Sequence, residues 1–61
     1  MKEEYIETIK AFAENDMNVK RTGIAMHYAT NSIDYRLRKI EKETGLNPRK
    51  FYDLCELLKM A

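Results

Sequence analysis

Apolar residues recur at spacings of three and four along this chain, and this period is typical of amphipathic helices. The clearest case is residues 30–44, where Ile33, Leu37 and Ile40 fall on one face and polar residues occupy the rest. The same period appears in three other stretches. The pattern therefore predicts a small all-α domain of four helices, over residues 3–15, 19–26, 30–44 and 48–59.

The residues between these stretches are typical of helix ends. Asn18 is a good N-cap for the second helix, and Asn47-Pro48 suits the N-cap and first position of the fourth. His27 stands where the chain must turn, so we expect it in the left-handed region that histidine tolerates better than most residues. Gly45 is expected to close the third helix in the left-handed C′ position.

The fourth helix has a broad apolar surface. The residues expected on its inward face are Phe51, Leu54, Cys55 and Leu58. The apolar residues expected partly off that face are Tyr52, Leu57 and Met60. The width fits a dimer surface or the seat of another domain, and it equally fits ordinary core. Cys55 is the only cysteine, so we expect a buried, inert thiol and no internal disulfide.

Length restricts the kind of function. The 61 residues make one domain, too small to enclose a sizeable substrate pocket, so a function on the outer surface is favoured. No apolar stretch is long enough to span a membrane, and the charged N-terminus, MKEEYIET, does not resemble a signal peptide. The expected location is cytoplasmic.

Positive charge is concentrated in the middle of the chain. Residues 20–50 hold eight basic and three acidic residues, a net charge of +5, whereas the remainder carries −4, giving the overall +1. An uneven distribution of this kind is what phosphate binding needs. A solvated surface of mixed charge is the alternative.

Residues 18–45 have the organisation of a helix-turn-helix. A short helix, a tight turn and a longer basic helix follow one another, as in proteins that present the second helix to the major groove of DNA. Gly23 lies within the short helix, where it costs stability, so we expect the longer helix to approach closely there.

The candidate DNA contacts come from residues 30–44 and from the first turn of the helix at residues 19–26. Base contacts are expected from Thr30, Asn31 and Tyr35, since asparagine can form two hydrogen bonds with adenine. Phosphate contacts are expected from Lys20, Arg21, Ser32, Arg36, Arg38, Lys39 and Lys42. Each has an alternative role. Asn31 would make a local hydrogen bond that caps the helix, and Tyr35 would be a surface ring that shields the aliphatic stems of other side chains. Lys20 and Arg21 would be charges on a solvated surface.

Catalytic and metal chemistry have no support in the sequence. One cysteine and one histidine, Cys55 and His27, cannot supply the four ligands that zinc prefers. No nucleophile has an obvious base beside it, and no glycine-rich loop could cradle a phosphate. We therefore expect neither an enzyme nor a cofactor.

The stretch YIETIKAFAENDMNVKRTGIAMHYATNSIDYRLRKIEKETGLN resembles the C-terminal helix-turn-helix domain of PucR-type (purine catabolism and sugar-diacid) transcriptional regulators. It is similar, more distantly, to the DNA-binding part of the factor for inversion stimulation. The most specific matches are Asn18-Val19, Asn31-Ser32-Ile33, Tyr35-Arg36-Leu37 and Thr44-Gly45-Leu46. The resemblance implies sequence-specific double-stranded DNA binding in transcriptional regulation. It also implies an upstream sensor domain as a partner.

Two positions depart from the family pattern. Ala29-Thr30 stands where the family usually has His-Arg, and Asp34 stands where arginine is usual. The departures motivate an alternative, a protein–protein interaction module that keeps the fold without binding DNA. If DNA is bound, one small module binds weakly, so two copies on adjacent half-sites are expected, with a homodimer formed through the fourth helix.

Overall fold

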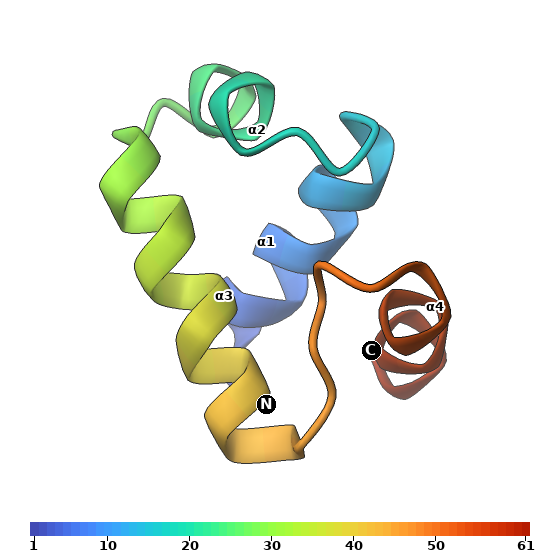
Figure 1. Cartoon of the computed structure of the whole chain (residues 1–61). Helices are drawn as coiled ribbons and strands as arrows, with labels where there is room; N and C mark the ends of the chain where they lie inside the picture. Colours follow the sequence, from blue (N-terminus) through green and yellow to red (C-terminus); the bar gives the residue numbers. More distant parts are fainter.

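The computed structural model describes residues 1–61, and its regular elements are four helices. Helix α1 spans Glu3–Glu14, α2 spans Val19–Met26, α3 spans Thr30–Thr44 and α4 spans Phe51–Met60. Figure 1 shows α3 and α4 on opposite sides of α1, with α2 across one end. The predicted all-α fold is therefore confirmed. None of the helices is long and apolar enough to cross a membrane.

The core is built from three of the helices. The predicted inward face of α3 is confirmed, because Ile33, Leu37 and Ile40 are at most 2% exposed. Burying these side chains is what holds a helix of this length in place. The other buried apolar side chains are Tyr5, Ile9 and Phe12 of α1, and Leu54 and Leu57 of α4.

The predicted ends of α2 and α3 are confirmed. The Asn18 side chain accepts a hydrogen bond of 2.9 Å from the backbone N–H of Arg21, as an N-cap should. His27 adopts the left-handed conformation with φ of 62°, and Gly45 does so with φ of 76°. The Gly45 N–H donates to the Glu41 carbonyl at 2.8 Å, which closes the last turn of α3.

Helix α1 ends in a way that the sequence pattern did not indicate. Asp16 and Met17 both have positive φ, at 58° and 59°. The Met17 N–H donates to the Phe12 carbonyl at 2.8 Å and the Asp16 N–H to the Ala13 carbonyl at 3.3 Å. This is the Schellman pattern without glycine. It allows Met17 to pack against the core.

The predicted start of the fourth helix at Pro48 is wrong, because α4 begins at Phe51. Asn47 instead forms a turn, in which its side-chain oxygen accepts from the Arg49 N–H at 3.0 Å and its carbonyl from the Lys50 N–H at 2.9 Å. The Asn47 N–H donates to Asp53 Oδ2 at 3.0 Å. Pro48 itself is fully buried.

The predicted inward face of α4 is also wrong in part. Leu57 is fully buried and Leu54 is nearly so, whereas Phe51 is 62% exposed. The later start of the helix leaves Phe51 at its open N-terminal end. Cys55 is half-buried rather than buried, and Leu58 is half-buried against the core.

Candidate nucleic-acid interface

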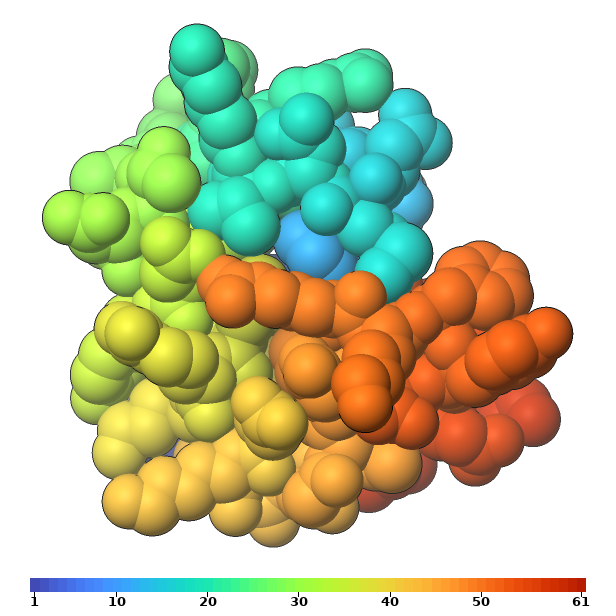
Figure 2. All heavy atoms as spheres, in the orientation of Figure 1, coloured from blue at the N-terminus to red at the C-terminus, as the bar shows by residue number.

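The outer face of α3 consists of Asn31, Tyr35, Arg38, Lys39 and Lys42. It lies opposite Ile33, Leu37 and Ile40, whose burial fixes the rotation of the helix. All five side chains are exposed except that of Lys39, which is half-buried. Figure 2 shows α2 (teal), α3 (green to yellow) and the segment that precedes α4 (orange) on one side of the molecule.

The turn between α2 and α3 sets how closely the two helices meet. The Tyr28 N–H donates to the Gly23 carbonyl at 2.8 Å, so the chain folds back over the last turn of α2. A Cβ atom added to Gly23 would lie 2.7 Å from the Tyr28 carbonyl oxygen. The close approach at Gly23 is therefore made by the turn. The expectation that α3 itself approaches closely is wrong, because Ile33 Cγ1 and Thr30 N would lie at an ordinary contact distance of 3.7 Å.

The N-terminus of α3 carries two predicted base contacts, Thr30 and Asn31. Its N-cap is Ala29, and no side chain caps the helix. Asn31 therefore does not make the local cap bond that was its alternative role. Both Thr30 and Asn31 are exposed, so their side chains face solvent.

Tyr35, the third predicted base contact, lies one turn from Asn31 and is 52% exposed. Lys39 Nζ lies 5.8 Å from the centre of the Tyr35 ring. A cation at this distance is attracted to the ring face. The contact therefore places one ammonium group beside one aromatic ring on the outer face.

Three of the predicted phosphate contacts are cations without intramolecular partners. Lys20, Arg38 and Lys42 are exposed and form no ion pair or side-chain hydrogen bond. Ser32 is half-buried at the side of α3. The cations are therefore available to a polyanion without any internal pair having to break.

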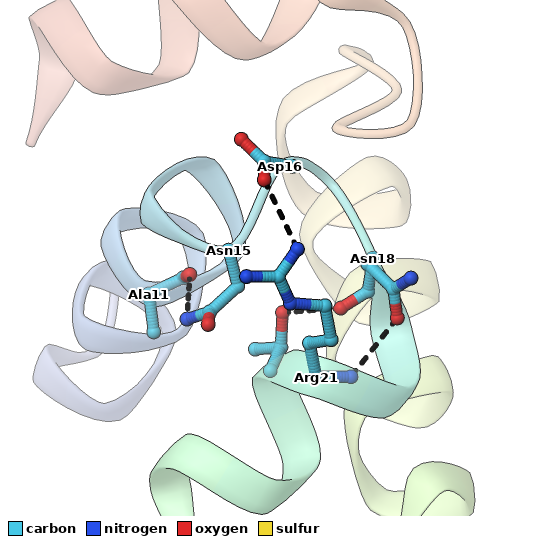
Figure 3. Close-up of polar contacts among 6 residues, drawn as sticks. Ala11, Asn15, Asp16, Asn18 and Arg21 are labelled. Carbon is cyan, nitrogen blue, oxygen red and sulfur yellow. Dashed lines mark hydrogen bonds and ion pairs between the residues drawn. The ribbon is translucent and has the colours of Figure 1, made fainter.

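Arg21 spans the turn between α1 and α2, as Figure 3 shows. Its Nη1 donates to Asp16 Oδ2 at 3.1 Å, while the two side chains remain 59% and 78% exposed. Asn15 closes the neighbouring end of α1 by donating to the Ala11 carbonyl at 2.7 Å. An exposed ion pair contributes little to stability, so Arg21 can exchange Asp16 for another anion at low cost.

Arg36 is placed differently from the other predicted phosphate contacts. Its side chain is only 13% exposed, with Nη2 lying 3.6 Å from a Glu4 carboxylate oxygen. Nη1 donates to Thr8 Oγ1 at 3.1 Å, and the guanidinium lies 4.3 Å from the centre of the Tyr28 ring. Arg36 therefore joins α3 to α1 and to the turn, and its guanidinium is engaged within the molecule rather than free for a phosphate.

Asp34, the acid that departs from the family pattern, has a partner that the sequence analysis did not identify. It accepts a hydrogen bond from Arg49 Nη2 in the segment between α3 and α4. The two residues are fifteen positions apart, and no helical spacing connects them. The negative charge of Asp34 is therefore offset within the molecule.

A shallow apolar groove lies between the end of α1 and α4. Its volume is about 330 Å³, and Asp16 is its only polar lining residue. The apolar lining residues are Ala13, Met17, Phe51, Leu54, Cys55 and Leu58. No group of three His, Cys, Asp or Glu side chains lies together anywhere in the chain. The groove therefore holds no such group of potential metal ligands.

Comparison with known proteins identifies the family. The model of the PucR C-terminal helix-turn-helix domain matches residues 5–59. An uncharacterized protein of Bacillus subtilis (strain 168), YsfB, is 41% identical over 44 residues, which cover 72% of this chain and 12% of that protein. No solved structure matches the chain significantly. The chain thus corresponds to a small fraction of its longer relative, and it belongs to the PucR C-terminal helix-turn-helix domain family.

Proposed function

We propose that this domain binds double-stranded DNA in transcriptional regulation, with α3 in the major groove. The observation that carries the proposal is the outer face of α3, where Arg38 and Lys42 have no internal partner and Asn31 makes no cap bond. Helix-turn-helix proteins read bases with the N-terminal part of the second helix. The family is one of regulator domains and not a class of enzymes.

Affinity and specificity are assigned to different residues. Lys20, Arg21, Arg38, Lys39 and Lys42 would neutralise phosphates, with Ser32 as a neutral donor. Asn31, Tyr35 and Thr30 would contact base edges, since they occupy the first half of α3. Sequence discrimination would therefore depend on polar and aromatic groups rather than on arginine.

Two copies of the domain would bind adjacent half-sites on the DNA. One module of this size presents a single recognition helix, and two half-sites one helical turn apart raise the affinity. Phe51, Tyr52 and Met60 of α4 are all more than half exposed, which supports a homodimer formed through this helix. An upstream sensor domain would be a further partner, and the location would be cytoplasmic.

The alternative of a protein-interaction module without DNA binding rested on the Ala29-Thr30 pair and on Asp34. Its ion pair with Arg49 offsets the charge that would repel phosphate. The outer face of α3 retains its cations. DNA binding is therefore the better supported of the two functions.

Fluorescence anisotropy of a labelled random-sequence duplex tests the proposal. Log K should fall linearly with log salt concentration, by about 0.9 for each phosphate neutralised, so five cations give a slope of about −4 to −5. Binding should be followed by selection of a preferred site from a random pool. A folded protein that leaves the anisotropy unchanged at low salt would exclude DNA binding and restore the interaction-module alternative.

A further inference from the structure

We infer that Arg49, outside the helix-turn-helix, is an additional phosphate contact that Asp34 positions beside the outer face of α3. The inference rests on the proposed DNA binding and extends its surface to the segment before α4. It assigns a role to the acid on α3 that departs from the family pattern.

The guanidinium of Arg49 can bind an anion in addition to Asp34. Asp34 engages one nitrogen, Nη2, and the Arg49 side chain makes no other hydrogen bond or ion pair. Arginine has five donors in a planar fork, so donors remain for an anion beyond Asp34. The side chain is 45% exposed, which leaves room for that anion.

The backbone of this segment is fixed before any DNA arrives. Pro48 is fully buried, and the Asn47 side chain accepts a hydrogen bond from the Arg49 N–H at 3.0 Å. The Asn47 N–H donates in turn to Asp53 Oδ2 at 3.0 Å. A side chain that starts from an anchored turn loses less freedom when it binds, which favours a specific contact.

The position of Asp34 on α3 places Arg49 next to the proposed phosphate contacts. Asp34 lies one turn before Arg38, and a rotation of 100° per residue puts it at the border of the outer face. Figure 2 shows the segment before α4, in orange, extending to the green and yellow atoms of α3. Arg49 and Arg38 would therefore meet the same stretch of DNA backbone.

The inference is tested by Arg49→Ala, made in the wild-type protein and in Asp34→Asn. Each duplex-binding isotherm is measured by anisotropy over a range of salt concentrations. We expect Arg49→Ala to make the salt slope shallower by about 0.9 in both backgrounds, because one phosphate contact is lost. Asp34→Asn removes the charge but keeps a side-chain oxygen that can accept the hydrogen bond from Arg49, so Arg49 stays in position. Lys10→Ala removes the same charge from the exposed side of α1 and should leave the slope unchanged.

Three outcomes would overturn the inference. A slope unchanged by Arg49→Ala while the wild type binds would place Arg49 off the interface. A change in the wild-type background that disappears in Asp34→Asn would mean that Arg49 only shields the acid. No binding by the wild type would overturn the proposed function, and this inference with it. Melting curves should show that all variants are folded, since an exposed ion pair contributes little to stability.

Discussion

The guanidinium of Arg36 lies 4.3 Å from the centre of the Tyr28 ring, and its nitrogens reach Thr8 and Glu4 on α1. One side chain thus joins α3 to the turn before it and to α1. Its neighbour Arg38 has no such partners. Two arginines, two positions apart, therefore have separate roles.

Arg36→Ala should lower the free energy of unfolding by about 1–2 kcal/mol, because it removes a cation–π contact and a charged hydrogen bond. Urea denaturation measures the change. Arg38→Ala is the matched control and should stay within about 0.5 kcal/mol of wild type, as exposed substitutions usually do. Equal stability of the two variants would contradict the structural role of Arg36.

Replacing both Arg38 and Lys39 by alanine should weaken binding to every duplex sequence. The salt slope should become shallower by about 1.8, since each lost phosphate contact accounts for about 0.9. The control is Lys10→Ala with Lys59→Ala, which removes two charges from α1 and α4. Similar slopes for both double variants would mean that α3 does not dock on DNA through its outer face.

Ile33→Ala and Leu37→Ala should each lower the free energy of unfolding by about 2–5 kcal/mol, because both side chains are nearly inaccessible and leave cavities. Such a loss would unfold much of a domain this small. Ile24→Ala is a matched control, since Ile24 is 69% exposed on α2. A thermal melt of Ile33→Ala that resembles that of the control would show that α3 is rotated differently.

Gly23→Ala should destabilise the protein, although alanine is the better helix former by about 1 kcal/mol. The added Cβ would lie 2.7 Å from the Tyr28 carbonyl oxygen, so the turn would have to shift. Thermal denaturation gives the sign of the change. A higher melting temperature would mean that the turn can move aside at no cost.

Substitutions at the two left-handed residues that end α2 and α3 should change the free energy of unfolding in opposite directions. His27→Gly should raise the free energy of unfolding by up to about 1 kcal/mol, because a left-handed conformation is costly for residues with a Cβ atom. Gly45→Ala should lower it by a similar amount, although space around Gly45 is open. Urea denaturation of both variants checks the pair, and a destabilising His27→Gly would point to a side-chain contact of the histidine.

Local sequence signals predicted most of the fold. The spacing of Ile33, Leu37 and Ile40 gave the rotation of α3, and Asn18 and Gly45 marked two helix ends correctly. These signals work because a helix period and a cap depend on residues within one or two turns. The same reasoning failed at Asn47-Pro48, where a buried proline and the distant Asp53 favour a turn over a helix start.

The candidate interface was predictable only in part. The residues on the outer face of α3 are those opposite its apolar inward face. Asn31, Tyr35 and Arg38 could therefore be identified as outward-facing from the sequence. Arg36 lies beside that face. Helical spacing does not reveal that α1 passes close enough for Arg36 to donate a hydrogen bond to Thr8. The pairing of Asp34 with Arg49 likewise depends on where the chain returns after α3, which is a property of the tertiary structure.

The backbone of α4 lies close to that of α1 and to that of no other helix. Opening α4 would therefore leave the contacts among α1, α2 and α3 in place, so its amide protons should exchange with solvent before those of α3. Asp53, at the start of α4, also holds the turn that carries Arg49. A local unfolding event at the C-terminal helix would thus loosen the segment beside α3. Motion of α4 would then make one border of the proposed DNA surface more flexible.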